Sequence, residues 1–247
     1  MHSLPLTAET IFTLGGLPIT NTILATWLGM AILVVIGWLT ARAMRAGYRG
    51  FWGGFALLLE GLFTFLEDLL GFDATKRLMP ALGTFFLFII SANWLGLVPG
   101  FGSITTTIGE EHIPVLRGAT TDVHTTLALG VLSIVIIQIW GFSQQGLPYL
   151  KKYLNFSGPW YFTPIYVFVG LLEIISEFAK ILSFGFRLFG NIFAGEVLLS
   201  IMIGLIPLVV PSVFYGLELF VGFIQAFVFV LLSAVFLKLA GESHAEH

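Results

Sequence analysis

Long apolar segments, each at least one bilayer in length, restrict this chain to a helical membrane fold. Only 10% of its 247 residues are charged and 57% are hydrophobic, whereas a soluble domain has about 25% charged residues. Hydrocarbon offers no partner to a free backbone amide, so each segment is expected to be a helix. We predict one all-α integral membrane domain over residues 1–247, with five transmembrane helices and one amphipathic helix. The five segments are residues 21–41, 78–98, 123–142, 165–205 and 212–239.

Basic residues at the ends of these segments predict an orientation. They follow the first and third segments, precede the second and end the last, so the positive-inside rule assigns these ends to the cytoplasm. The tail 1–20 and the loop 99–122 then lie outside, and the tail 240–247 lies in the cytoplasm. Arg117, in the outer loop, is the basic residue that disagrees with this topology. The residues used are Arg42, Arg45, Arg49, Lys76, Arg77, Lys151, Lys152 and Lys238.

Residues 51–72 differ from the five segments because three acids interrupt their apolar pattern. Glu60 and Glu67 are seven residues apart and share a helical face, and Asp68 follows them. We expect an amphipathic helix that lies on the cytoplasmic membrane surface. The alternative is a true span with buried acids.

The last two apolar segments, residues 165–205 and 212–239, are long. A helix of roughly 40 residues reaches about 60 Å, whereas the hydrocarbon of a bilayer is about 30 Å thick. We predict a hairpin of two long, tilted helices, unless the first turns of the first helix lie at the interface. Pro207 and Pro211 mark the turn between them, on the outer side.

Composition argues against several classes of function. The chain has no cysteine, which rules out disulfides and thiolate chemistry. Three of its five histidines lie in the terminal tails, so we expect neither a metal site nor a cofactor. The net charge of −3 gives no sign of nucleic-acid binding. The two halves of the chain do not resemble each other, which argues against a transporter built from repeats.

One polar stripe runs along residues 165–205 and has an arginine near its middle. Arginine keeps its proton, and a charge at the bilayer centre costs at least ~2.5–3.5 kcal/mol, so such a residue usually faces protein or water. Glu177 lies about a quarter turn off the stripe, and Glu196 lies about half a turn round from the arginine. The stripe consists of Glu173, Lys180, Ser183, Arg187 and Asn191.

The following helix supplies matching polar residues. If the turn is centred near Pro207, Glu196 lies 11 residues before it and Glu218 lies 11 after it. Arg187 and Gln225 lie 20 residues before and 18 after the same point. We therefore expect an outer polar level with two carboxylates and a central level around the arginine. Two carboxylates close together in a low dielectric can accept and release a proton.

Each of these residues also has a purely structural interpretation. Asn191 and Gln225 can be interhelical hydrogen-bonding residues, and Lys180 can extend back to the interface. The two acids can be satisfied buried carboxylates, and Arg187 can form a buried ion pair with a glutamate. Close helix packing suffices to explain the glycines at 185, 190 and 195, although a smooth surface for a sliding partner also fits.

A family resemblance narrows these alternatives. The string Arg187-Leu-Phe-Gly-Asn191-Ile-Phe-Ala-Gly-Glu196 resembles the signature of subunit a of F-type ATP synthases, the ATPase A chain family of the F0 sector. Gln225-Ala-Phe-Val-Phe and Asn93-Trp-Leu-Gly-Leu-Val-Pro are similar to further parts of the family pattern. The resemblance runs from about residue 20 to residue 240.

The resemblance implies a role for each polar residue. Arg187 would occupy the place of the family's essential arginine. The family varies at position 218, and a glutamate here favours a two-carboxylate relay over one that uses imidazole. The outer half-channel would contain Glu196, Glu218, Asn191 and Gln225, the inner one Glu173 and Ser183, and further candidates are Glu177, Lys180 and Asn93.

The resemblance also implies a non-catalytic subunit that forms the stator half of a rotary proton path. Its partners would be a ring of c subunits, the b subunits of the peripheral stalk, the rest of the F1F0 complex and lipid. We expect a multi-pass protein of an energy-coupling membrane, the bacterial cell membrane, with its N-terminus outside. A self-contained channel or secondary transporter is the alternative, and a membrane scaffold is a third interpretation.

Overall fold

The computed structural model describes residues 9–45, 51–98, 101, 104–108, 111–153, 163–205 and 209–242. Within these ranges six α-helices carry the fold, joined by two short 3₁₀ helices and two small β-hairpins. The α-helices are α1 (Asn21–Arg45), α2 (Phe51–Leu70), α3 (Phe72–Leu97), α4 (Val123–Gln145), α5 (Thr163–Leu205) and α6 (Val209–Gly241). The other elements are β1 (Thr10–Leu14), β2 (Leu17–Thr20), β3 (Thr105–Ile108), β4 (Glu111–Pro114), η1 (Ala119–Thr121) and η2 (Leu147–Lys152).

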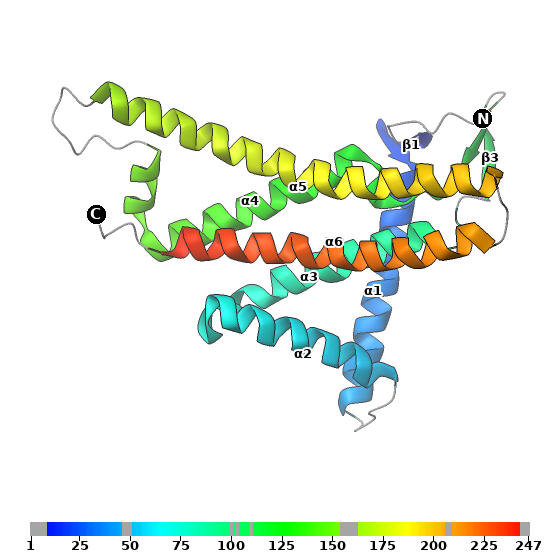
Figure 1. Ribbon diagram of the computed structural model, residues 1–247, viewed down its shortest axis with the longest axis horizontal. Helices are drawn as coiled ribbons and strands as arrows, with labels where there is room; N and C mark the ends of the chain where they lie inside the picture. The colour runs from blue at the N-terminus through cyan, green and yellow to red at the C-terminus, as the bar shows by residue number, and fades with distance from the viewer. Residues whose placement is uncertain are drawn as a thin grey trace.

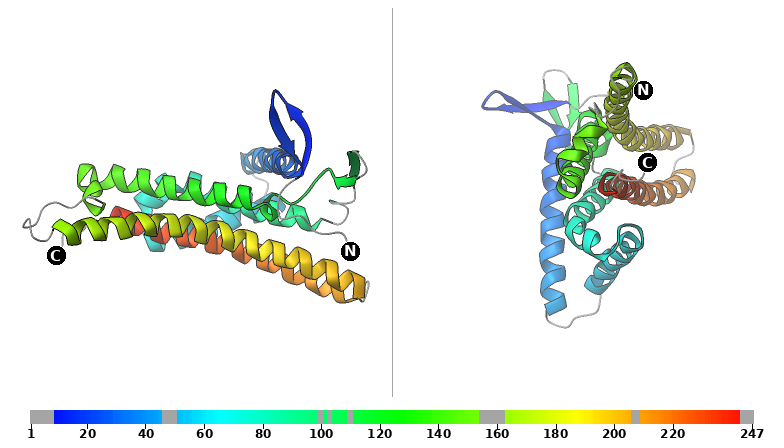
Figure 2. Two further views of the ribbon diagram at one scale, coloured as in Figure 1. Left: turned by 90° about the horizontal axis from the view of Figure 1, so that it is seen from above. Right: turned by 90° about the vertical axis from the view of Figure 1, so that its left-hand side faces the viewer.

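Four helices run lengthwise through the molecule, and one crosses them. α5 starts apart from α6 and converges on it along the chain, while α3 packs against α6 and α4 packs against both long helices (Figure 1). α1 crosses this group at a steep angle and lies at its side (Figure 2). If α1 stands upright in a bilayer, α5 and α6 are strongly tilted, as their 43 and 33 residues require.

Within the residues that the structure describes, four helices are long and apolar enough to cross a membrane, which is consistent with an integral membrane protein of the all-α class. They are Asn21–Arg42, Phe72–Leu97, Val123–Gln145 and Pro211–Gly241. The fifth predicted span is α5, which interrupts its apolar sequence with five charged residues. α2 also carries acids, and its predicted place on the membrane surface stays a prediction.

The segments predicted to lie outside the membrane carry more structure than the sequence indicated. The predicted tail 1–20 contains the antiparallel pair β1–β2, and the predicted loop 99–122 contains the pair β3–β4. Gly15 and Gly16 have φ angles of 60° and 87°, which suits a two-residue hairpin turn. α3 begins at Phe72 rather than at residue 78, so Lys76 lies inside the helix. The predicted turn at Pro207 lies outside the described residues.

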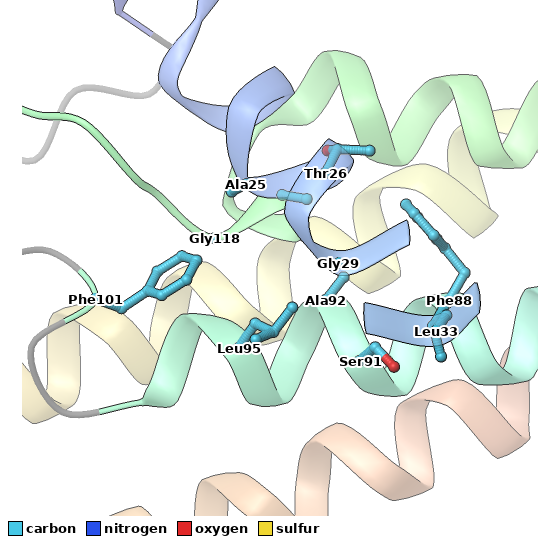
Figure 3. Close-up of a pocket in the computed structure, with 11 residues that line it drawn as sticks. Ala25, Thr26, Gly29, Leu33, Phe88, Ser91, Ala92, Leu95, Phe101 and Gly118 are labelled. Atoms are coloured by element: carbon cyan, nitrogen blue, oxygen red, sulfur yellow. The ribbon is translucent and has the colours of Figure 1, made fainter. Parts of the chain in front are cut away.

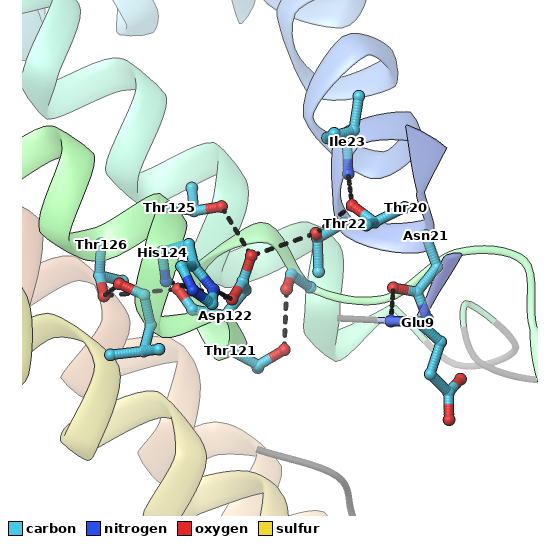
Figure 4. Close-up of polar contacts among 12 residues, drawn as sticks. Glu9, Thr20, Asn21, Thr22, Ile23, Thr121, Asp122, His124, Thr125 and Thr126 are labelled. Atoms are coloured by element: carbon cyan, nitrogen blue, oxygen red, sulfur yellow. Dashed lines mark hydrogen bonds and ion pairs between the residues drawn. The ribbon is translucent and has the colours of Figure 1, made fainter. Parts of the chain in front are cut away.

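Asp122 joins these outer elements to the helices. It is the N-cap of α4 and accepts hydrogen bonds from the His124 backbone N–H and the Thr125 hydroxyl. The carboxylate oxygen that accepts from Thr125 also accepts from the Thr22 hydroxyl of α1 at 3.4 Å (Figure 4). Asn21 donates to the carbonyl of Pro114, at the end of β4. α1 is therefore fixed to the outer loop at its first turn.

Small residues bring α1 against α3. A methyl group at Gly29 would lie 3.2 Å from Leu95 Cδ1, and Ala25 and Ala92 line the same contact (Figure 3). The cavity between the helices has a volume of about 10 Å³, no more than one water molecule needs. We therefore regard this contact as packing, not as a ligand site.

The core lies between α3, α4, α5 and α6. Phe229 of α6 contacts Phe85 of α3 and Phe184 of α5 in edge-on ring pairs with centroids 5.5 Å and 4.8 Å apart. Leu188 of α5 and Val230 of α6 are fully buried. Because Leu188 directly follows Arg187, burial of the leucine fixes the direction in which α5 presents its arginine.

Two glycines let α4 and α5 approach closely. A methyl group on Gly130 would lie 2.8 Å from the carbonyl oxygen of Ile181, and one on Gly185 would lie 3.1 Å from Leu127 Cα. A methyl group on Gly190 would meet nothing within 4 Å. Close packing thus explains the glycine at 185, whereas the glycine at 190 leaves an open surface.

We predict that Gly185→Ala destabilises the subunit and that Gly190→Ala does not. The new methyl group at 185 faces backbone as well as the Leu127 side chain, so a rotamer change cannot relieve it, and overpacking of this kind costs about 1–3 kcal/mol. Thermal unfolding of the purified subunit in detergent measures the effect. Equal midpoints for the two variants would contradict the close contact.

Candidate functional site

Arg187 lies near the middle of α5 with an exposed side chain. Its guanidinium Nη2 donates to the hydroxyl of Ser183, one turn earlier, at 3.2 Å. Among the described residues no ion pair joins it to an acid. The buried Arg187–glutamate pair considered from the sequence is therefore absent from this part of the chain.

A groove starts at Arg187 and follows α5 toward its first residues. Its volume is about 370 Å³. Lys180 lies in it, with its ammonium 5.0 Å from the ring centre of Phe236 in α6. One wall belongs to α5 and the other to α6, and the lining residues are Ser176, Ala179, Lys180, Ser183, Phe184, Arg187, Leu232 and Phe236. The structure thus brings three members of the polar stripe into one groove.

Beyond the groove, four charged side chains form an ion-pair cluster. Lys152 of η2 lies 2.6 Å from a carboxylate oxygen of Glu173 and 2.9 Å from one of Glu177. Lys180 lies 2.9 Å from the same oxygen of Glu177. The helical angles place Glu177 off the polar stripe, but its carboxylate pairs with Lys180 of that stripe. Lys180 thus contacts this acid and also lines the groove.

Lys152 stays charged in this cluster. Burial alone would lower the pKa of the Lys152 ammonium, but hydrogen bonds to Glu173 and Glu177 outweigh it and raise the pKa above its ordinary value. Burial and the nearby Glu177 charge raise the pKa of the neighbouring Tyr153 phenol to about 12. Both groups therefore keep their protons throughout the physiological pH range.

Glu196 lies on the other side of Arg187 along α5, and its partner comes from the outer loop. Arg117 Nη2 is 3.9 Å from Glu196 Oε2, and the arginine side chain is only 6% exposed. The helical periodicity of the sequence does not predict this partner. The one signal in the sequence is a lone basic residue that violates the expected topology, and the partly buried acid beside it explains that violation.

Glu218 of α6 lies against α5 at Gly195, the residue that precedes Glu196. A methyl group on Gly195 would overlap the Glu218 carboxylate, so the missing side chain at 195 makes room for the acid. This contact places the two glutamates at one level, as the residue count predicts. Asn191 has a buried amide nitrogen without a hydrogen-bond partner in the described structure, and Gln225 is buried.

Asn93 lies on α3 rather than on α5 or α6, and it binds the backbone of α6. Its amide nitrogen donates to the carbonyl of Gly222 in α6 at 3.0 Å, and Trp94 donates to the carbonyl of Leu219 at 3.0 Å. These two bonds fix α3 to α6 between Glu218 and Gln225. Asn93 thus holds the helix that carries two site residues.

The site therefore consists of fixed charges and hydrogen-bonding groups along the α5–α6 pair. No cluster of three or more His, Asp or Glu residues in the described ranges could hold a metal ion. Arg187 separates a groove that ends at one ion-pair cluster from a second acid-containing region beside Arg117. Such an arrangement is suited to exchanging protons or binding a charged partner.

The fold and this site define a multi-pass helical membrane protein with a charged arginine between two acidic regions. The model of the ATP synthase A chain family matches residues 23–238, which is most of the chain. The chain belongs to this family, and the resemblance carried by the Arg187 string is confirmed. It is thus a membrane subunit of the proton-translocating F0 sector of ATP synthase and is not itself catalytic.

We predict that Gly195→Ala lowers proton pumping by about tenfold or more. Overlap with the new methyl group moves the Glu218 carboxylate off its position, and a misplacement of about 1 Å can cost a hundredfold in rate. Gly204→Ala is the matched control, because a methyl group on Gly204 of the same helix would meet nothing within 4 Å. ATP-driven acidification of inverted membrane vesicles measures both variants, and equal rates would refute the role of this contact.

Proposed function

We propose that this subunit provides two offset half-channels to a ring of c subunits and couples proton flow to rotation of that ring. One observation carries the proposal. Every other charged side chain of α5 contacts an opposite charge within this chain, whereas Arg187 contacts only the Ser183 hydroxyl in the described structure. An exposed guanidinium in an apolar helix favours a carboxylate supplied by another subunit.

The outer half-channel contains Glu196, Glu218, Asn191 and Gln225. A proton that enters from outside binds a carboxylate of this region and passes to an acid on the ring. The protonated ring acid is neutral, so it can face lipid at low cost, which a carboxylate cannot. The ring then turns and carries the proton away from the outer half-channel.

The inner half-channel is the groove between α5 and α6 that runs from Arg187 to Ser176. After nearly a full turn, the ring acid meets this groove and releases its proton past Ser183 toward Glu173. Arg187 stabilises the resulting carboxylate as it passes. Because the guanidinium keeps its own proton, it does not relay one directly between the two half-channels. Each proton that crosses 100 mV delivers about 2.3 kcal/mol.

The proposed orientation has the N-terminus outside and the C-terminus in the cytoplasm of a bacterial cell. The groove and the Lys152 cluster then face the cytoplasm, and Arg117 with the two β-hairpins faces outward. α2 lies on the cytoplasmic surface, and α5 is the fifth span. The b subunits of the peripheral stalk hold this stator against the turning ring.

We predict that Arg187→Ala abolishes ATP-driven proton pumping and ATP synthesis while the complex still assembles. The variant removes the charge that stabilises the ring carboxylate, and it leaves the buried core residue Leu188 unchanged. Vesicles that contain the reconstituted ATP synthase measure both activities.

Arg42→Ala is the matched control, because Arg42 is an exposed arginine at the end of α1 that contacts Trp38. We expect it to retain both activities. Coupled synthesis at the normal rate in Arg187→Ala would exclude the rotary proposal. Solute movement by the subunit reconstituted alone would instead support a self-contained transporter.

A further inference from the structure

One ammonium group binds two acids at the cytoplasmic end of the proposed inner half-channel. Glu173 and Glu177 are one helical turn apart on α5, and Lys152 lies within 2.6 Å and 2.9 Å of their carboxylates. Lys180 contacts the Glu177 oxygen that Lys152 also contacts. Two ammonium groups thus balance two carboxylates where the groove ends.

The fold positions Lys152 through the two tyrosines of its own segment. The two rings pack edge to face against each other, and the ammonium lies beside both, 5.8 Å from the ring centre of Tyr149 and 5.5 Å from that of Tyr153. Both phenols donate to one side-chain oxygen of Gln138 in α4, at 2.8 Å and 3.0 Å. The absence of a side chain at Gly141 makes room for the Tyr149 ring. Lys152 is therefore held against α5, whereas the preceding Lys151 is exposed.

The charges around the cluster come from few elements. α5 contributes Glu173, Glu177 and Lys180, and η2 contributes Lys152 with the two tyrosines. α4 contributes the neutral Gln138, and α6 contributes the ring of Phe236 below Lys180. Removal of Lys152 leaves one ammonium for two carboxylates.

We propose that Lys152 is a positioning residue that sets the cytoplasmic pH range over which the inner half-channel exchanges protons, by holding Glu173 and Glu177 as carboxylates. The proposal rests on the function proposed above. A proton that binds either acid must displace it from Lys152, so the cluster binds protons weakly and releases them readily. Without Lys152 the two acids repel each other, and a bound proton relieves that repulsion.

The direction of the effect follows from this balance. ATP-driven pumping takes protons from the cytoplasmic side, so stronger proton binding extends pumping to higher pH. Loss of one close opposite charge shifts proton binding by on the order of one pH unit or more. The half-maximal pH for pumping should therefore rise by about one unit in Lys152→Met.

The test uses the whole ATP synthase in inverted vesicles, whose cytoplasmic face is open to the buffer. Pumping is measured across a series of buffer pH values and divided by ATP hydrolysis with the membrane uncoupled, which removes the pH dependence of the F1 sector. Lys151→Met is the matched control and should keep the wild-type midpoint. Lys152→Arg keeps the charge and should stay close to it.

A double variant separates charge balance from folding. Lys152→Met with Glu177→Gln again has one ammonium for one carboxylate, so its midpoint should return toward the wild-type value. An unchanged midpoint in a fully assembled Lys152→Met complex overturns the proposal. So does failure of both the single and the double variant to assemble, because Lys152 would then serve the fold alone.

The two proposals fail separately. If Lys152→Met leaves the pH profile unchanged while Arg187→Ala abolishes pumping, only the inference about Lys152 is wrong. If Arg187→Ala pumps normally at every pH, the rotary function itself is excluded.

Discussion

The central feature of the structure is a guanidinium, that of Arg187, which has no acidic partner among the described residues. A guanidinium cannot lose its proton, and hydrocarbon cannot solvate it, so an arginine on an apolar helix requires a carboxylate or water. In the described structure Lys152, Lys180 and Arg117 compensate the acids of α5. Arg187 is left with the Ser183 hydroxyl and an open groove. The charge of Arg187 is thus left exposed on the surface of the described structure.

The length of α5 separates the acids on the two sides of Arg187. α5 has 43 residues and reaches about 65 Å, so it crosses about 30 Å of hydrocarbon only when strongly tilted. Glu173 lies 14 residues before Arg187 and Glu196 lies nine residues after it, which separates these groups by about 21 Å and 14 Å along the helix. In a tilted helix much of this separation runs parallel to the membrane. The two proposed half-channels would therefore be displaced sideways from each other, as the proposed turning ring requires.

The sequence predicted the elements that follow from periodicity, and it missed the contacts made by loops. Apolar length predicted the helices, although α3 begins six residues before its predicted start. The helical angles grouped Lys180, Ser183 and Arg187, which the groove brings together. Arg117 and Lys152 were treated only as topology signals. Their positions depend on how the outer loop and η2 fold back on α5, and no helical period encodes that. The role of Gly195 was hidden for the same reason, because its close neighbour belongs to another helix.

The most direct test of the central claim is the side of the membrane from which water reaches each half of α5. The chain has no cysteine, so a single introduced thiol can be followed in this subunit. The two variants are Ser176→Cys and Asn191→Cys. Ser176 lines the groove, and Asn191 lies four residues after Arg187. In the assembled complex, a membrane-impermeant thiol reagent should label position 176 only from the cytoplasmic side and position 191 only from outside. Labelling of both positions from one side, or of either from both sides, would contradict two half-channels divided at Arg187.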